Sequence, residues 1–316
     1  MRRHSTPIVI TVRLAIVAAS IAVGSTFIPA AHAQQTPAPA AAPAQTPNQT
    51  AGRAPIPLDP RVQIRTHHFA ETNEDVPYAL FVSSKVRRDH KAPMIVTLHG
   101  LGGTHTTMMR ANAIDLAEAG GYILVAPMGY NPRGWYGIPA GPPRRGGAAS
   151  PGATSSGTPA TRPAFPPSAQ PQPNDPPNLR ELSEKETLEV VDLVRKEFVV
   201  DDSRTYLMGH SMGGAGTYYL AIKYPERWAA IGVEAPAAFA LDPNALAKIP
   251  NMPIMVVHGD MDTLVPVSLS RTWVDVMKSL KMSYEYVEIP GGDHGSVINQ
   301  GAAPIFAFFA QHSKTR

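Results

Sequence analysis

The sequence contains no cysteine among its 316 residues. Disulfide bonds, a thiolate nucleophile, a cysteine-ligated zinc site and a lipidated N-terminal cysteine are therefore all excluded. The fold must rest on a sizeable hydrophobic core, which a 43% content of hydrophobic residues can supply. The HExxH pattern is also missing, although the chain has 11 histidines. We therefore expect no metal site.

The chain also lacks a long hydrophobic run at its N-terminus. The apolar stretch there, LAIVAASIAVG, is short, lies after Arg2, Arg3 and Arg13, and is closed by the A-x-A site at residues 31–33. A basic start, a short apolar middle and such a site predict a secretory signal peptide rather than a transmembrane anchor. We expect residues 1–33 to be removed and the mature chain to be secreted or periplasmic, with no stable membrane association.

An excess of charge of one sign is missing as well. The full chain has 28 basic and 25 acidic residues. Residues 1–33 hold three arginines and no acid, so their removal leaves 25 residues of each sign. The basic character belongs largely to the predicted signal and gives no argument for a nucleic-acid partner.

Two segments are rich in proline and poor in large apolar side chains. Residues 34–57 combine proline, alanine and polar residues, which predicts an extended, disordered linker. Residues 139–178 hold 12 prolines and 5 glycines in 40 positions, which predicts a disordered surface insertion. We expect one folded domain over residues 58–316, interrupted by this insertion.

Short apolar runs alternate with amphipathic stretches in the rest of the chain. The runs VQIRTHHF and PYALFVSS predict an opening antiparallel pair, and PMIVTLHG, YILVAPM, TYLMG, WAAIGVEA, PIMVVHG and YEYVEI predict further strands. Helices are expected over Thr106–Ala119, Leu182–Phe198, Met212–Lys223, Pro266–Leu280 and Gly301–His312. A capping box of Ser183 and Glu186 is expected to open the second helix. This alternation predicts an α/β fold with a mostly parallel sheet, covered by helices on both faces.

The stretch GHSMG, Gly209 to Gly213, fits the G-x-S-x-G pattern between a predicted strand and a predicted helix. That setting favours a strained turn that exposes a nucleophilic serine, Ser211, over a plain glycine-rich turn. Gly209 and Gly213 leave room around it. The N–H of Met212 comes at a helix N-terminus, where it is placed to bind a developing oxyanion.

A serine hydroxyl needs a general base, and the base needs an orienting carboxylate. After the run PIMVVHG come Asp260 and Asp262, and after YEYVEI comes His294 among glycines. Asp293 is better suited to cap its turn, because sequence neighbours rarely face each other well enough to orient an imidazole. Glu234 is a weaker alternative acid. The choice between Asp260 and Asp262 stays open on these residues alone.

Further candidate site residues come from loops at other strand ends. The loop LHGLGG, Leu98–Gly103, predicts a second oxyanion donor in the N–H of Leu101. Such a donor is typically worth roughly 3 kcal/mol to the transition state. Trp135 and Tyr136 are candidates for an aromatic wall of the substrate site, with packing under the loop as an equal alternative. We expect His210 to lie at the substrate site too.

Three histidines at predicted strand ends are expected to support the site. His99, His210 and His258 each adjoin a glycine where a predicted strand ends. We expect these three rings to shape the site by hydrogen bonds rather than to transfer protons.

The motifs HGLGG, GHSMGG, HGDMDTLVP and GGDHG together resemble those of α/β-hydrolase-fold serine esterases, above all the secreted polyhydroxybutyrate-depolymerase and feruloyl-esterase-like group. That group is related to peptidases of the prolyl-oligopeptidase type. The resemblance covers about residues 60–316 outside the insertion. It implies the α/β-hydrolase fold with Ser211 as nucleophile and His294 as base, and it selects Asp262, which stands in the G-x-x-D-x-x-V-P pattern of the acid.

This chain departs from that group in two respects. Several extracellular members carry disulfides near the site, and this chain has none. The insertion at residues 139–178 also lies where such enzymes vary their lids, so the resemblance does not imply a substrate class.

Motifs and resemblance together predict a secreted serine hydrolase of small or polymeric carboxylic esters, working through an acyl-enzyme without a cofactor. A peptidase of the prolyl-oligopeptidase type is an alternative, although the chain is too short for an additional propeller domain. An acyltransferase and a non-catalytic binding protein on a hydrolase scaffold are further alternatives. The sequence does not indicate the oligomeric state.

Overall fold

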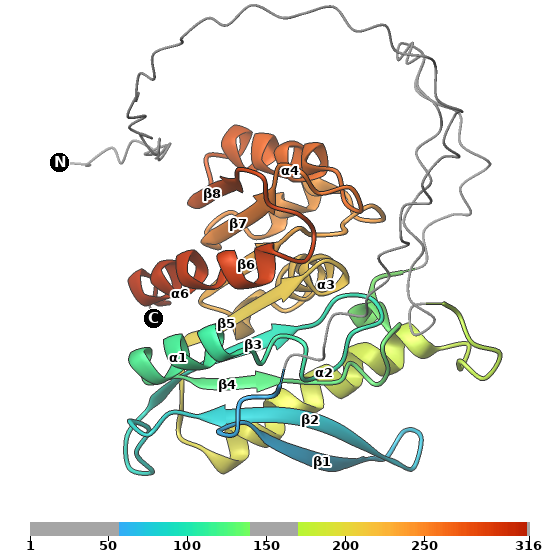
Figure 1. Ribbon diagram of the computed structural model, residues 1–316, viewed down its shortest axis with the longest axis vertical. Helices are drawn as coiled ribbons and strands as arrows, with labels where there is room; N and C mark the ends of the chain where they lie inside the picture. The colour runs from blue at the N-terminus through green and yellow to red at the C-terminus, as the bar shows by residue number, and fades with distance from the viewer. Residues whose placement is uncertain (1–56, 140–169, 315–316) are drawn as a thin grey trace, which may run out of the picture. The chain divides into compact units, whose positions relative to one another are not determined.

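An eight-stranded sheet forms the centre of the protein in the computed structural model, which describes residues 57–139 and 170–314 (Figure 1). The strands lie in the order β1-β2-β4-β3-β5-β6-β7-β8. They are β1 Gln63–Phe69, β2 Glu74–Val82, β3 Ala92–Leu98, β4 Ile123–Ala126, β5 Val200–His210, β6 Ala230–Glu234, β7 Ile254–Gly259 and β8 Tyr284–Ile289. The pairs β1–β2 and β2–β4 are antiparallel and the others parallel, which confirms the predicted sheet.

Helices cover both faces of this sheet. The α-helices are α1 Ala111–Gly120, α2 Leu179–Glu197, α3 Met212–Lys223, α4 Val267–Ser279, α5 Val297–Gln300 and α6 Ala302–Gln311. Short 3-10 turns are η1 Trp135–Gly137, η3 Pro225–Arg227 and η4 Pro243–Lys248. Apolar side chains of α2, α3 and α4 share one core cluster, and those of α1 and α6 share another. The predicted two-layer cover is therefore confirmed.

The two clusters lie on opposite faces because side chains alternate along a strand. In β7, Ile254 and Val256 belong to the core under α2, α3 and α4, whereas Met255 and Val257 belong to the core under α1 and α6. All six residues of β7 are buried. The continuous apolar run that predicted this strand thus reflects burial on both faces.

Three local features differ from the sequence predictions. The first helix begins at Ala111 rather than at residue 106, because the preceding residues form turns. The closing helix matches α6, but the short helix α5 that precedes it was not predicted. The capping box is wrong: α2 begins at Leu179, so Ser183 and Glu186 lie inside the helix, and both are fully buried.

Both buried side chains anchor the loop after β4 instead. The hydroxyl of Ser183 accepts a hydrogen bond from the N–H of Tyr136 at 3.1 Å, and Glu186 accepts one from the N–H of Tyr130 at 3.1 Å. Burial raises the pKa of Glu186, and the hydrogen bonds from His67 and from this loop oppose that shift.

Several predicted segments lie wholly or largely outside the described residues: the signal peptide at 1–33, the linker at 34–57 and most of the insertion at 139–178. The described residues from Leu58 onward form one compact unit. At the end of the insertion, Asp175 accepts hydrogen bonds from Arg133 and Asn131 of the loop after β4. No helix within the described residues is long and apolar enough to cross a bilayer.

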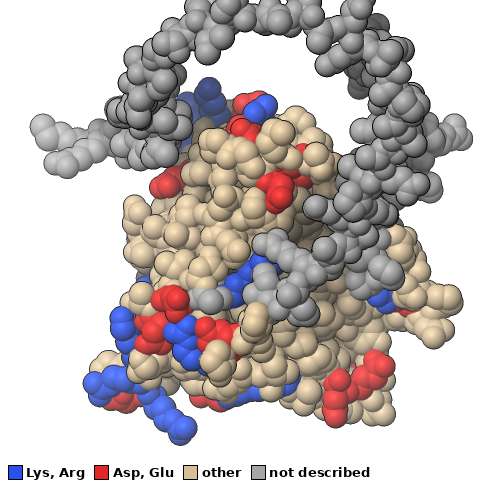
Figure 2. Space-filling view, viewed as in Figure 1, with Lys and Arg blue, Asp and Glu red and all other residues tan. Residues whose placement is uncertain are grey.

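Most of the described surface on the face drawn in Figure 2 is uncharged, and acidic and basic side chains are interspersed at its lower left.

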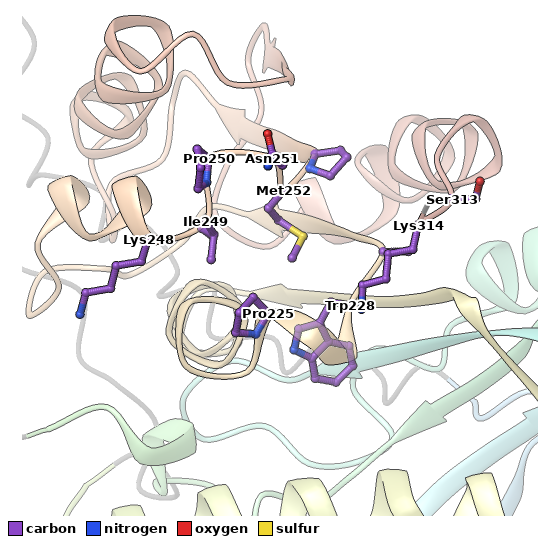
Figure 3. A pocket seen from close by; sticks show the side chains of 11 residues that line it. Pro225, Trp228, Lys248, Ile249, Pro250, Asn251, Met252, Ser313 and Lys314 are labelled. Carbon is purple, nitrogen blue, oxygen red and sulfur yellow. The ribbon is translucent and has the colours of Figure 1, made fainter. Parts of the chain in front are cut away.

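A cavity of about 410 Å³ lies among Trp228, Met252, Lys314 and their neighbours (Figure 3). These residues precede β6 and β7 or follow α6. The cavity therefore lies at the amino ends of the strands, opposite the edge where chemistry collects in such sheets.

Candidate active site

Ser211 occupies a sharp turn between β5 and α3. Its backbone has φ 57° and ψ −114°, a conformation that non-glycine residues rarely adopt. A Cβ on Gly209 would lie 2.4 Å from the carbonyl oxygen of Gly213, and one on Gly213 would lie 2.2 Å from that of Leu98. The main-chain N–H of Ser211 donates to the main-chain carbonyl oxygen of Glu234 in β6 at 2.9 Å. The turn therefore requires both glycines and is held to the neighbouring strand.

Asp262 and His294 meet although 32 positions separate them. The Nδ1–H of His294 donates to Oδ2 of Asp262 at 2.7 Å. The other carboxylate oxygen, Oδ1, accepts the N–H groups of Leu264 and Val265, both at 2.9 Å. Burial acts to raise the pKa of Asp262, but the hydrogen bonds from His258 and His294 outweigh it and hold the pKa well below its usual range. The carboxylate is thus ionised and fixed in orientation.

His294 also lies against the serine turn. Its carbonyl oxygen is 2.6 Å from Nε2 of His210, and the two imidazole centroids are 4.6 Å apart. His210 immediately precedes Ser211, so the structure brings the segments of the predicted nucleophile and base together. Within the described residues there is no hydrogen bond between Ser211 Oγ and His294. Serine–histidine pairs in unliganded hydrolases are often too long for one.

The other carboxylates near this pair have their own backbone partners or none. Asp260 accepts the N–H of Gly291 at 2.7 Å, which joins the two loops. Asp293 accepts the N–H of Ser296 at 2.7 Å and so closes a turn. Glu234 is fully buried at the end of β6, and neither of its carboxyl oxygens has a hydrogen-bond partner within the described residues. Burial raises its pKa well above the usual range.

The predicted oxyanion donors belong to the loop after β3 and to the start of α3. In that loop, Gly100 packs so closely on Ser211 that a Cβ there would lie 3.2 Å from Cβ of the serine. In the same loop, the N–H of Gly102 donates to Pro132 and that of Gly103 to Gly100. The N–H of Leu101 has no acceptor within the described residues. The N–H of Met212, the first residue of α3, has none there either, which leaves both free to meet a ligand.

Tyr136, predicted as part of a substrate wall, is instead fully buried. Its hydroxyl donates to the carbonyl oxygen of His99 at 3.1 Å, and its ring packs so closely on Gly216 that a Cβ there would lie 2.6 Å away. The structure therefore does not bring its ring to the substrate side. Trp135 is only half-buried, and the guanidinium of Arg180 lies 5.6 Å from its ring centroid.

His99 and His210 are both buried beneath the site. The ring nitrogens of His99 lie 2.8 Å and 2.9 Å from the carbonyl oxygens of Gly100 and Met128, so the ring bridges the loops after β3 and β4. Burial lowers the pKa of His99 and lowers that of His210 to about 3. His210 is therefore a neutral hydrogen-bonding group near pH 7.

Comparison with known proteins relates this arrangement to ester hydrolases. Residues 174–312 match the family described as Phospholipase/Carboxylesterase. Cutinase 1 of Thermobifida cellulosilytica is 33% identical over 96 residues, which are 30% of this chain and 34% of that protein. The chain thus spans about a third of the length of this curated relative.

Solved structures extend the likeness over most of the chain. A ferulic acid esterase from Anaeromyces mucronatus superposes with a TM-score of 0.57 and 18% identity, covering 79% of this chain and 90% of that one. A putative dipeptidyl aminopeptidase IV from Bacteroides ovatus gives 0.53 and 16%, covering 79% of this chain and 36% of that one. The predicted α/β-hydrolase fold is confirmed, and so is the resemblance to esterases of that fold.

Proposed function

We propose that this chain, which has the α/β-hydrolase fold, is an exported hydrolase of carboxylic esters that works through an acyl-enzyme on Ser211. The observation that carries the proposal is the 2.7 Å hydrogen bond between Asp262 and His294, held against the serine turn by His210. The match to carboxylesterases supports the choice of esters.

Asp262 fixes which nitrogen of the base is available. An ionised carboxylate can only accept hydrogen bonds, so Nδ1 of His294 carries the proton that joins them. In the neutral ring, Nε2 is then left as an acceptor. It takes the proton of Ser211 as Oγ attacks the ester carbonyl, and Asp262 stabilises the imidazolium that forms.

The carbonyl oxygen becomes negatively charged in the tetrahedral intermediate. The main-chain N–H groups of Leu101 and Met212 receive this charge, and one such donor is typically worth roughly 3 kcal/mol. His294 then protonates the leaving alcohol through Nε2, and the acyl group stays on Ser211. A water, deprotonated by the same nitrogen, attacks the acyl-enzyme, and His294 returns that proton to Oγ of Ser211 as the acid leaves. These steps need no cofactor.

The substrate is a small-molecule or polymeric ester. Half-buried Trp135 is the aromatic side chain that we propose for contact with its acyl or aryl group. The names of the similar proteins, a cutinase and a ferulic acid esterase, suggest polyester and hydroxycinnamoyl esters as the first substrates to test.

Hydrolysis of a chromogenic short-chain acyl ester tests the proposal. The mature chain should release the chromophore, and Ser211→Ala should abolish release and labelling by a fluorophosphonate. Activity that persists in Ser211→Ala contradicts the nucleophile. Cleavage of blocked peptides in place of esters favours a peptidase, and an acceptor alcohol that outcompetes water favours an acyltransferase. Failure of the wild type to take the label favours a binding protein.

We also propose export through residues 1–33. Expression of the full sequence in a bacterial host should yield a mature chain in the periplasm or medium that begins at Gln34. N-terminal sequencing checks the cleavage point. A protein that keeps Met1 and stays in the cytoplasm contradicts export.

A further inference from the structure

A second histidine approaches the carboxylate of the proposed catalytic acid. Nε2 of His258, near the end of β7, lies 3.2 Å from Oδ2 of Asp262, the same oxygen that meets His294. It also lies 2.9 Å from the carbonyl oxygen of Val265. The other nitrogen of His258, Nδ1, lies 2.7 Å from the hydroxyl of Ser270 on α4.

These contacts determine where the proton of His258 lies. A carbonyl oxygen cannot donate, so Nε2 must carry a hydrogen to pair with Val265. The same nitrogen lies 3.2 Å from Oδ2 of Asp262, a longer approach than the one to Val265. In the neutral ring Nδ1 is then an acceptor, and the hydroxyl of Ser270 can donate to it.

The group is sealed from solvent, so these bonds are not exchanged with water. His258 and Ser270 are fully buried, and the side chain of Asp262 has no exposed surface. Oδ1 accepts two backbone N–H groups and Oδ2 accepts Nδ1–H of His294, and Nε2 of His258 lies 3.2 Å from the same Oδ2. Hydrogen bonds are strong in such a site, and a lost partner is costly.

We propose that His258 is a positioning residue for the catalytic acid, and that Ser270 fixes the tautomer in which it donates to Asp262. The role rests on the proposed function, because it concerns how Asp262 orients His294. His258 holds Oδ2 in place for His294 and disperses part of its negative charge. Both effects reach Ser211 only through His294.

The charge effect has a definite sign. Asp262 favours the imidazolium form of His294, and a second donor on Oδ2 weakens that pull. Removal of the His258 donor leaves more negative charge on Oδ2 and so favours the imidazolium form of the neighbouring ring. The other ionisable groups facing this set are His210 beside His294, Glu288 of β8, which interacts with His258, and Asp293, which interacts with Asp262. None of them is altered by a change at Ser270.

Three variants test the proposal by hydrolysis of the chromogenic ester. His258→Phe removes the donor, His258→Gln offers an amide N–H in place of Nε2–H, and Ser270→Ala frees the tautomer. We expect kcat to fall by about tenfold or more in His258→Phe and Ser270→Ala, with KM little changed. The acid limb of kcat/KM should move to higher pH in both. His258→Gln should restore most of kcat and the wild-type profile.

Thr205→Val is the matched control, because it also removes a buried hydroxyl, whose bond goes to Asp201 at 3.1 Å, at the far end of β5. It should change thermal stability without moving the pH profile. A profile in His258→Phe and Ser270→Ala that coincides with that of Thr205→Val overturns the proposal.

A second measurement works on the unaltered protein and does not need ester hydrolysis. Nitrogen-15 spectra of the histidine rings, with His258 assigned from the signals lost in His258→Gln, report which ring nitrogen is protonated. We expect a proton on Nε2 and none on Nδ1. A protonated Nδ1 overturns the proposal, even if Ser211→Ala abolishes hydrolysis as the proposed function requires. An inactive wild type with the expected tautomer contradicts the function alone.

Discussion

The imidazole of His210 donates its Nε2–H to the carbonyl oxygen of His294 at 2.6 Å. Because Ser211 follows His210 directly, one hydrogen bond ties the main chain of the proposed base to the turn of the proposed nucleophile. Burial, and secondly the charge of His294, lower the pKa of His210 to about 3. The ring is thus neutral in the folded protein near pH 7, whereas in the unfolded chain its pKa is near 6.5.

This difference predicts a pH-dependent stability. Between pH 6.5 and about 3 the unfolded state binds the proton and the folded state does not, so His210 makes the free energy of unfolding fall as pH falls through this window. His210→Gln keeps an N–H donor but does not titrate, so its stability should fall less steeply than that of the wild type. Urea unfolding at several pH values measures both slopes. Exposed His90→Gln is the control, and an unchanged slope in His210→Gln contradicts the prediction.

The choice between two aspartates predicts a large difference in activity. Asp262→Asn should lower kcat by on the order of 10⁴-fold, because an amide at this position can hold His294 in the wrong tautomer. Asp260→Asn is the matched control, since its carbonyl oxygen can still accept the N–H of Gly291. It should keep near wild-type activity. Ester hydrolysis by the two purified variants decides between the acids, and a greater loss in Asp260→Asn would reverse the assignment.

The centre of the sheet was predictable from the sequence because strands such as β3, β4, β6 and β7 are buried along their whole length. Runs such as PIMVVHG leave no polar face, and a G-x-S-x-G turn between a strand and a helix is specific enough to place Ser211 at a strand end. The pairing of Asp262 with His294 depends on two loops, and only the resemblance selected Asp262 over Asp260 in advance.

The mispredictions have a common physical cause, which is tertiary packing that local patterns do not encode. Ser183 and Glu186 have capping-box spacing, but α2 begins before them, at Leu179. Their side chains instead bind the main chain of the loop after β4. Tyr136 follows half-buried Trp135, but a positive φ of 51° directs the chain so that its ring enters the core. His258 was expected to shape the site by hydrogen bonds, but no periodic pattern indicated its contact with Asp262, four positions along the chain.

The glycines of the serine turn predict a steric limit. Gly213→Ala would place Cβ 2.2 Å from the carbonyl oxygen of Leu98, which belongs to backbone and cannot move freely. We expect a loss of at least about 1–3 kcal/mol in the free energy of unfolding, as for other overpacked sites. Thermal or urea unfolding measures the loss. Gly295→Ala, where the nearest atom is 3.8 Å away, is the control and should unfold with the wild type.

Glu234 predicts a stability change of the opposite sign to that of His210. Burial raises its pKa well above 4.5, so as pH rises above 4.5 the unfolded state loses the proton while the folded state keeps it. The free energy of unfolding therefore falls as pH rises through this window. Glu234→Gln is isosteric and neutral, so it should gain stability relative to the wild type as pH increases. Urea unfolding from pH 4 to pH 8 checks this, and parallel slopes in the two proteins contradict it.

Trp135 and Tyr136 predict separable effects, because one ring is half-exposed and the other is sealed in the core. Tyr136→Phe loses the hydrogen bond to His99, which should cost about 1 kcal/mol of stability and leave KM unchanged. Trp135→Ala should raise KM for aryl esters more than for short acyl esters if its ring contacts the substrate. Steady-state kinetics on both ester classes, with thermal unfolding of both variants, separate the two roles. A rise in KM confined to Tyr136→Phe would mean that the loop opens enough in solution to expose the buried ring.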